Sequence, residues 1–522
     1  MKGAVAAGHP LTAEAGARIL AEGGNAVDAC IAAAFVSWVA ESPLTGPGGG
    51  GFMLVHRAQD GTDRLLDFFV AVPGAGLSPR ERGEMVAVDV PFDERTTQVF
   101  HIGPAASAVP GAPAGLALAH RRYGRLPWAE LIAPAIGTAR AGVTLNAGQA
   151  FLHEILDVIL RAEPEGRAVY GGNCALGEGD RIVMDDLAGT LEWLAAEGAG
   201  ILYRGELARR LSTAVQERGG AITEADLGAY RVISRRPVRA AYRRGEFVSN
   251  PPPSSGGLLI AFALRVLNGL GPMPARDNAE SLARLAEAMR EAARARGGNF
   301  VTELYRGGAA GRMLADERVA EAVETARGRS AEAALEPAGA PSTTHISVVD
   351  GNGDAASLSA STGCGSGFVV PGTGIQLNNM LGEPDLNVPG KAPRPGTRLT
   401  SMMAPSMVLE GGRPRLVVGS AGSIRLRGAI LQIVVNVVDH GLSAEQAVEA
   451  PRIHLEEGAV QLEGGIDAAA GDRLEDAGYA VNRWARRNLY FGGASAVAIR
   501  SDGGLEAAGD PRRGGAGVVV TA

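Results

Sequence analysis

The chain has 522 residues, of which 46% are hydrophobic and 20% are charged. This balance is that of a folded globular protein and excludes an intrinsically disordered chain. The net charge of −7 lacks the basic excess of a general nucleic-acid-binding protein, so we expect no nucleic-acid partner.

Cysteine and histidine are few and scattered. Cys30, Cys174 and Cys364 cannot form a disulfide framework and fit a reducing compartment. No CxxC or HExxH motif occurs, so we expect neither a metal site nor another cofactor. The first ten residues lack the apolar run of a signal peptide, and the longest apolar stretch, 29–40, is too short to span a bilayer. We expect a cytoplasmic protein without a membrane partner.

Helix and strand signals alternate from the N-terminus. Thr12 is predicted to cap a first helix, and Asn25 is predicted to open a second, very apolar one. Residues 51–56 and 64–69 have the composition of buried strands. The Ala-, Glu- and Pro-rich run from 318 to 342 is predicted to be an exposed connector.

The C-terminal part begins with a hairpin signal. Residues 343–349 and 355–361 are predicted strands on either side of a turn at 350–354. Further on, a buried strand passes through a turn at 419–423 into an apolar helix, 425–439. This alternation predicts an α/β protein in which helices cover the sheets.

The glycine run 46–51 matches the string GxGxxG. A dinucleotide-binding loop follows a strand and opens a helix, whereas this run follows a helix and precedes a strand. Close backbone packing, or the wall of a site, explains it better. No GxSxG nucleophile elbow occurs in the chain, which disfavours an α/β-hydrolase.

The sequence Ser342-Thr343-Thr344 contains a candidate nucleophile. A hydroxyl group needs an adjacent base. If the chain cuts itself before a threonine, the freed α-amine, with a pKa of about 7.7–8.0, becomes that base. The alternative is a strand-initiating threonine cluster without a catalytic role.

The turn at Gly422-Ser423 is a candidate for the second catalytic element. Backbone N–H groups at a strand-to-helix turn can hold an oxyanion, although an ordinary glycine turn is the alternative. A threonine nucleophile and an oxyanion turn together indicate acyl transfer.

A series of short motifs extends over nearly the whole chain. In order, they are GNAVDA at 24–29, GGGGFM at 48–53, PG at 110–111, PPPSSGG at 251–257, TTHISVVD at 343–350, GIQLNN at 374–379 and APR at 450–452. Through them the chain resembles the γ-glutamyltranspeptidases, which are self-processing N-terminal-nucleophile hydrolases. The resemblance implies a four-layer αββα sandwich.

The resemblance also implies autocleavage between Ser342 and Thr343. The products would be a large subunit, 1–342, and a small subunit, 343–522, which stay together as one intertwined fold. These two subunits and a small-molecule substrate are the expected partners.

Catalytic roles follow from the same motifs. Thr343 would be the nucleophile, and the N–H groups of Gly422 and Ser423 would stabilise the oxyanion. The family usually has glycine at both turn positions, and serine at the second position keeps the N–H. The family's hydroxyl beside the nucleophile corresponds to Ser361 or to Ser359. His345 is expected to brace the strand without a catalytic role.

The substrate pocket departs from the family pattern. Phe69 stands where the family has an arginine that binds the glutamyl α-carboxylate, and a bidentate arginine is hard to replace. Arg398 or Arg425 could supply a substitute cation. Met380 replaces a glutamine, and Glu383 or Asp385 lies near the position that binds the amino group. The predicted substrate-binding residues are Phe69, Asn379, Met380, Glu383, Thr400 and Ser401.

We therefore expect a self-processed threonine hydrolase that cleaves a γ-glutamyl-like or related amide through an acyl-enzyme, with hydrolysis favoured over transpeptidation. One alternative is a divergent member in specialised metabolism, acting as an acylase or carbon–carbon bond hydrolase on a non-glutamyl substrate. Another is a non-catalytic binding protein on the same fold.

Overall fold

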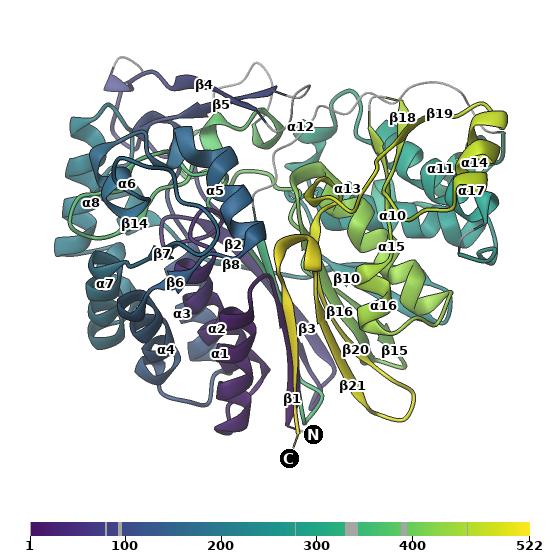
Figure 1. Cartoon of the computed structure of the whole chain (residues 1–522), viewed down its shortest axis with the longest axis horizontal. Helices are drawn as coiled ribbons and strands as arrows, with labels where there is room; N and C mark the ends of the chain where they lie inside the picture. Colours follow the sequence, from purple (N-terminus) through teal and green to yellow (C-terminus); the bar gives the residue numbers. More distant parts are fainter. Residues whose placement is uncertain are drawn as a thin grey trace.

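Two antiparallel sheets and their flanking helices make up the computed structural model of the chain (Figure 1). The structure describes residues 2–78, 81–91, 97–276, 278–328, 343–387, 394–456 and 458–521. Within these ranges, no helix has the length and apolar character needed to cross a membrane.

The predicted hairpin lies at the centre of a seven-stranded sheet. Its strands, in spatial order, are β22 (Ala516–Val520), β1 (Gly3–Ala7), β11 (Thr344–Asp350), β12 (Ala355–Ser361), β2 (Gly50–Arg57), β3 (Thr62–Phe68) and β8 (Ile233–Arg235). All neighbours are antiparallel. The sheet therefore joins strands from both sides of residue 343, and the predicted hairpin and the two predicted N-terminal strands are confirmed.

A second antiparallel sheet has six strands. They are β21 (Leu505–Gly509), β20 (Gly493–Ile499), β16 (Arg413–Ala421), β15 (Ser406–Glu410), β10 (Gly245–Ser249) and β9 (Val238–Tyr242). Strand β16, which ends directly before the predicted oxyanion turn, lies in its interior.

The two sheets pack face to face through alternate side chains. Phe52 and Leu54 of β2 share one buried apolar cluster with Val417 of β16. Met53 and Val55 point the other way and join the cluster beneath the helices. This period of two is that of a strand buried on both faces.

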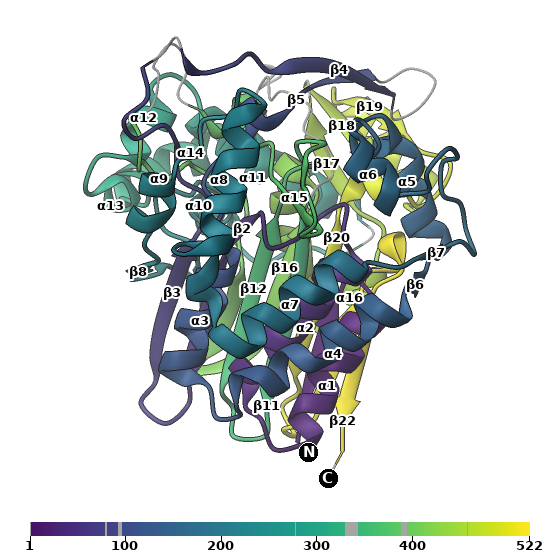
Figure 2. The ribbon, with the colours of Figure 1, turned by 90° about the vertical axis from the view of Figure 1, so that its left-hand side faces the viewer.

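Helices cover the outer face of each sheet (Figures 1 and 2). On the seven-stranded side lie α1 (Pro10–Ala21), α2 (Ala26–Ala40), α3 (Ala112–Tyr123), α4 (Trp128–Ala141) and α7 (Asp185–Glu197). On the six-stranded side lie α10 (Gly256–Gly269), α11 (Ala279–Ala295), α14 (Asp316–Gly328), α15 (Leu426–Val438) and α16 (Ala444–Glu449). This αββα order confirms the predicted fold class.

Smaller elements surround this sandwich. The remaining helices are α5 (Ala147–Leu160), α6 (Pro164–Val169), α8 (Glu206–Glu217), α9 (Glu224–Ala229), α12 (Phe300–Leu304), α13 (Ala309–Met313) and α17 (Ala468–Asp476). The remaining strands are β4 (Val86–Pro91), β5 (Thr97–Ile102), β6 (Val143–Thr144), β7 (Arg181–Ile182), β13 (Val369–Val370), β14 (Ile375–Gln376), β17 (Ile453–Glu456), β18 (Ala459–Leu462) and β19 (Ala480–Arg483).

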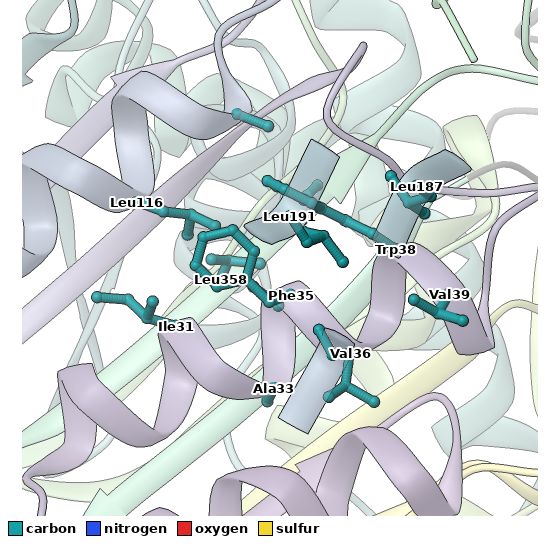
Figure 3. Packing of buried hydrophobic residues seen from close by; sticks show 14 of the residues in the cluster. Ile31, Ala33, Phe35, Val36, Trp38, Val39, Leu116, Leu187, Leu191 and Leu358 are labelled. Atoms are coloured by element: carbon teal, nitrogen blue, oxygen red, sulfur yellow. The ribbon is translucent and has the colours of Figure 1, made fainter. Parts of the chain in front are cut away.

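Helix α2 is apolar on every side because it is buried on every side. Its predicted cap is confirmed: the Asn25 side chain accepts from the Asp28 N–H at 3.0 Å, and Asp28 accepts from the Asn25 N–H at 3.1 Å. Phe35 and Trp38 meet edge to face, with ring centroids 4.7 Å apart (Figure 3). The helix ends at Ala40, and the N–H of the next residue, Glu41, donates to the carbonyl oxygen of Ser37.

Two local predictions are wrong. Helix α1 is capped by His9, and Thr12 lies inside the helix, where its hydroxyl donates to Glu41 at 2.9 Å. A tertiary partner has thus replaced the local capping bond. The predicted connector from 318 is helical up to residue 328 in α14, and its remainder lies outside the described residues.

Candidate active site

Thr343 lies directly before the central strand β11 and has a strained backbone. Its φ is +130°, a value that L-residues rarely adopt. The residue is 4% exposed, and its carbonyl oxygen accepts a hydrogen bond from Arg513 Nη1 at 3.0 Å. Tertiary contacts therefore hold the predicted nucleophile. Ser342, the other predicted autocleavage residue, lies outside the described residues.

The predicted oxyanion turn is a second strained point. Gly422 has φ +120°, and Ser423, the first residue of the 3-10 turn η6 (Ser423–Arg425), has φ +51°. In the described part of the chain, the non-glycine residues with positive φ are Arg243, Thr343 and Ser423. Two of these three are predicted catalytic residues, and strain of this kind collects at functional sites.

One side chain connects the two strained points. Arg513, which binds the carbonyl of Thr343, crosses Gly493 so closely that a Cβ there would be 2.2 Å from Arg513 Cδ. Gly493 pairs with Ala421, the residue before Gly422. The start of β11 and the end of β16 therefore lie at the same end of the sandwich.

The hairpin register separates the two candidate serines. His345 is paired with Ser359, so the same register places Ser361 beside Thr343, two positions further on. The hydroxyl of Ser359 is hydrogen-bonded to His345 Nδ1 at 2.8 Å. The hydroxyl of Ser361 accepts from the Gly363 N–H at 2.8 Å. Ser361 is therefore the alternative that adjoins the predicted nucleophile.

His345 and Cys364 are buried without the environment of catalytic groups. The ring of His345 also contacts Ser347 at 3.0 Å, and burial lowers its pKa to about 3. The imidazole thus stays uncharged between the sheets. Burial raises the pKa of the Cys364 thiol well above its usual value, which keeps the thiol unreactive.

The glycine run 46–51 packs its backbone against β12. A Cβ on Gly49 would be 2.4 Å from the carbonyl oxygen of Ser361, and a Cβ on Gly51 would be 2.4 Å from that of Ser359. These approaches leave no room for side chains. The run forms a wall beside Ser361, as the packing interpretation predicts.

Sequence reasoning misses two charged residues at this end of the sandwich, Glu41 and Arg513. The hydroxyl of Thr344 donates to Glu41 Oε2 at 2.5 Å, across 303 positions of sequence. Arg513 reaches Thr343 across 170 positions. No local motif marks either contact, because each depends on the tertiary fold.

Phe69 is a packed core residue. It is 1% exposed, and its ring stacks on Phe52 with centroids 5.4 Å apart. Met380, at the second altered position, belongs to the same apolar cluster, together with Leu399 and Met403. The two replacements thus put packed apolar side chains where the resemblance places an arginine and a glutamine.

Neither candidate substitute cation is directed to a substrate carboxylate. Arg398 donates to the carbonyl oxygen of Phe69, to the Tyr230 hydroxyl at 2.7 Å and to the carbonyl oxygen of Arg231 at 2.6 Å. Its Nε also lies 3.3 Å from Asp67 Oδ1.

Arg425 is engaged elsewhere. Its Nη1 lies 3.7 Å from Glu456, and its guanidinium stacks over Tyr490 at 4.4 Å. Both arginines hold protein groups in place.

The end of the LNN motif and the residues after it form a polar cluster beside the Ser361 loop. Asn379 Nδ2 donates to Cys364 Sγ at 2.9 Å, and Asn379 Oδ1 accepts from the Cys364 N–H at 3.1 Å. A Cβ on Gly363 would be 2.5 Å from Glu383 Oε1. Burial and the neighbouring Asp385 raise the pKa of Glu383 to about 8. Of the two predicted acidic residues, Glu383 thus adjoins the loop that carries Ser361.

Thr400 and Ser401 contact the PPPSSGG loop. The Thr400 hydroxyl donates to the carbonyl oxygen of Pro253 at 2.6 Å. The carbonyl oxygen of Ser401 accepts from the hydroxyls of Ser254 and Ser255 at 2.8 and 3.1 Å. Both residues are buried, and the Thr400 hydroxyl and the Ser401 carbonyl oxygen fix this segment against the PPPSSGG loop.

The arrangement is suited to acyl transfer. A strained threonine, a neighbouring serine hydroxyl and a glycine turn meet at one end of the sandwich. Among the residues that the structure describes, no group of three or more His, Cys, Asp and Glu side chains could hold a metal ion. The fold and this site define the class of N-terminal-nucleophile hydrolases.

The γ-glutamyltranspeptidase family model matches residues 12–520. The chain therefore belongs to the γ-glutamyltranspeptidase family and is an enzyme of the N-terminal-nucleophile class. The acylase ACY 1 proenzyme of Pseudomonas sp. (strain SE83) is 34% identical over 100% of this chain and 94% of its own. The glutathione hydrolase proenzyme of Escherichia coli (strain K12) is 31% identical over 98% of this chain and 90% of its own.

Solved structures of similar fold agree with this assignment. The cephalosporin acylase from Bacillus halodurans has a TM-score of 0.86 and 26% identity, covering 99% of this chain and 95% of that one. The γ-glutamyltranspeptidase of Helicobacter pylori has a TM-score of 0.51 and 29% identity, covering 61% of this chain and 89% of that one. Relatives named as proenzymes agree with a self-processing precursor that acts on a small molecule.

Proposed function

We propose that the chain is cut between Ser342 and Thr343 and that Thr343 then hydrolyses an amide whose acyl group is not selected as a free γ-glutamyl head. The observation that carries the choice of substrate is Phe69. In place of the expected carboxylate-binding arginine, this side chain is buried and stacked on Phe52.

The proposed chemistry has two halves. The α-amine of Thr343 takes the proton of its own hydroxyl while Oγ1 attacks the substrate carbonyl carbon. The N–H groups of Gly422 and Ser423 hold the resulting oxyanion. The C–N bond then breaks, the proton passes to the leaving amine, and an ester on Thr343 remains. Water attacks this ester with the same amine as base, which releases the acid and restores the hydroxyl.

Loss of the arginine has a calculable consequence for the substrate. Removing one partner of a buried ion pair costs about 3–5 kcal/mol, which corresponds to a factor of roughly 10² to 10³ or more in binding. Arg398 does not offset this loss, because protein carbonyl and hydroxyl oxygens accept from its Nη1 and Nη2, and its Nε lies 3.3 Å from Asp67. The likeness to proteins named acylase ACY 1 and cephalosporin acylase supports the same choice.

Four p-nitroanilides test the substrate proposal, because they remove the amino group, the carboxylate or both from the γ-glutamyl compound. They are the γ-glutamyl, glutaryl, 4-aminobutanoyl and butanoyl compounds. We expect kcat/KM for the γ-glutamyl compound to lie within about tenfold of that for the butanoyl compound, since the carboxylate gains no cation. A preference for γ-glutamyl of about a thousandfold would contradict the proposal.

A further inference from the structure

Two buried charged side chains bind the two residues at the start of β11. Arg513, in the 3-10 turn η8 (Pro511–Arg513), donates through Nη1 to the carbonyl oxygen of Thr343 at 3.0 Å. Glu41 accepts from the hydroxyl of Thr344 at 2.5 Å. Arg513 therefore holds the backbone of Thr343, where φ is positive, and Glu41 holds the side chain of Thr344.

Glycines make room for both charged groups. A Cβ on Gly8 would be 2.4 Å from Glu41 Oε2, and a Cβ on Gly493 would be 2.2 Å from Arg513 Cδ. Thr12 donates a second hydrogen bond to Glu41 at 2.9 Å. These close approaches require small neighbours, so the surroundings of both side chains are specific.

Among the residues that the structure describes, no carboxylate forms a direct ion pair with Arg513. Burial lowers its pKa to about 10, while Glu41 and Asp510 act in the opposite direction. The guanidinium thus stays charged at neutral pH. In the described part of the chain, its Nε and Nη2 have no hydrogen-bond partner. Burial raises the pKa of Glu41, and the hydrogen bonds from Thr344 and Thr12 oppose that shift.

We propose that Arg513 and Glu41 are positioning residues for the nucleophile. Their contacts with Thr343 and Thr344 hold the strained backbone for self-cleavage, and the nearby charge of Arg513 keeps the freed α-amine of Thr343 unprotonated. The inference rests on the proposed function, in which that amine is the base.

The self-cleavage step uses the strained conformation directly. Thr343 Oγ1 attacks the carbonyl carbon of Ser342, the C–N bond breaks, and the hydroxyl proton ends on the Thr343 nitrogen. Water then hydrolyses the ester that has formed, which leaves a carboxylate on Ser342 and a free amine on Thr343. A fixed Thr343 carbonyl prevents the backbone from relaxing before this shift.

After cleavage, the sign of the nearby charge affects whether the α-amine of Thr343 is protonated. A cation disfavours the ammonium form and lowers its pKa, whereas a carboxylate raises it. The titratable and charged groups around this end of the sandwich are Glu41, Arg513, Asp510, Arg425, His345, His9 and His153. Burial holds the pKa values of the three histidines at about 3 to 4, so they carry no charge at neutral pH.

Two variants test the proposal, because they should shift the pH profile of turnover in opposite directions. Arg513→Met removes the cation, and we expect self-cleavage to slow about tenfold or more. In the mature enzyme, the acid limb of the pH profile of kcat/KM should shift to higher pH by about one unit. Glu41→Gln keeps an oxygen acceptor for Thr344 but removes the negative charge, so its acid limb should move down.

Arg513→Lys keeps the cation and should restore most of the wild-type rate and pH profile. Arg500→Met is the matched control, because Arg500 is exposed and pairs only with its neighbour Asp502 among the described residues. The readouts are intact mass against time for cleavage and hydrolysis of the most reactive of the four anilides against pH for turnover.

The outcomes separate this inference from the function on which it rests. A wild-type chain that is never cut at Ser342–Thr343 contradicts the proposed function. A wild type that is cut, with acid limbs unchanged in Arg513→Met and Glu41→Gln, overturns the role of the two charges. If Arg513→Met does not fold, two other results test the proposal. They are a shift of the acid limb of kcat/KM to lower pH in Glu41→Gln and a nearly wild-type rate in Arg513→Lys. The absence of both overturns the proposal.

Discussion

The nucleophile end and the acyl-recognition region belong to the same sandwich, but different forces shape them. At the nucleophile end, Thr343 and Ser423 have strained backbones, and a buried arginine holds the carbonyl oxygen of Thr343. In the acyl-recognition region, Phe69 and Met380 pack into an apolar cluster. The first region keeps a strained backbone conformation, and the second is shaped by apolar packing.

The difference explains how chemistry can persist while recognition changes. An oxyanion is held by backbone N–H groups, and these remain when serine replaces the second glycine of the turn. In the proposed function, recognition of a carboxylate depends on one side chain, and it is lost when phenylalanine stands in place of arginine. The replacement at the turn therefore leaves the chemistry intact, whereas the replacement at Phe69 changes recognition.

Phe69→Ala is expected to have the largest effect on stability. Truncating a buried phenylalanine costs about 3–5 kcal/mol, because the ring leaves a cavity against Phe52. The measurement is urea unfolding in an uncut Thr343→Ala background, so that each protein unfolds as one chain. At low temperature, Phe69→Ala in the wild-type background should still cleave itself. A loss below about 1 kcal/mol would mean that Phe69 does not act as core packing.

The contributions of His345 and Glu383 to folding stability should change with pH in opposite directions. Burial lowers the pKa of His345 to about 3, so its contribution to stability is complete above about pH 6.5 and is lost as the pH falls toward 3. Glu383 has a raised pKa of about 8, so its contribution is present below about pH 4.5 and is lost as the pH rises toward 8.

Unfolding of the uncut protein at pH 4.5, 6.5 and 8 checks these signs. His345→Gln should flatten the acid side, by about 1.4 kcal/mol for each pKa unit that is no longer shifted. Glu383→Gln should flatten the alkaline side. Identical pH profiles for the wild type and both variants would be inconsistent with these buried ionisable groups.

The serine pair of β12 sharpens the comparison within the nucleophile end. Ser361→Ala should lower kcat/KM about 10- to 100-fold, because it removes a hydrogen-bonding hydroxyl beside Thr343. Ser359→Ala is the matched control. It removes the partner of His345 and should reduce stability while kcat/KM changes less than about twofold. The reverse order of the two effects on kcat/KM would assign the catalytic hydroxyl to Ser359.

Ser423→Gly is expected to have the smallest effect. Glycine adopts positive φ without strain, so stability should rise by about 1 kcal/mol. The N–H group remains, and turnover should stay within about threefold of the wild type. Thermal unfolding and anilide hydrolysis measure the two quantities. A tenfold loss of turnover would show that the Ser423 hydroxyl takes part in the reaction.

Contiguous motifs made much of this molecule predictable. The hairpin that begins at Thr344, the turn at Gly422 and the cap at Asn25 each depend on residues that are close in sequence, so their local patterns could be interpreted directly. The replacement at Phe69 was visible for the same reason, although its stacking on Phe52 was not.

Tertiary contacts account for what the sequence did not predict. Glu41 meets Thr344 across 303 positions, which no local pattern encodes. Thr12 was assigned as a cap because its hydroxyl suits one, but that hydroxyl binds Glu41 instead. The choice between Ser359 and Ser361 needed the strand register, which places only the second beside Thr343.

Intact mass of the purified wild type beside Thr343→Ala tests the central claim most directly. The account predicts that the wild type separates into chains 1–342 and 343–522, while Thr343→Ala remains one chain of 53.5 kDa. A wild type that stays whole, or a Thr343→Ala variant cut at the same bond, would contradict it.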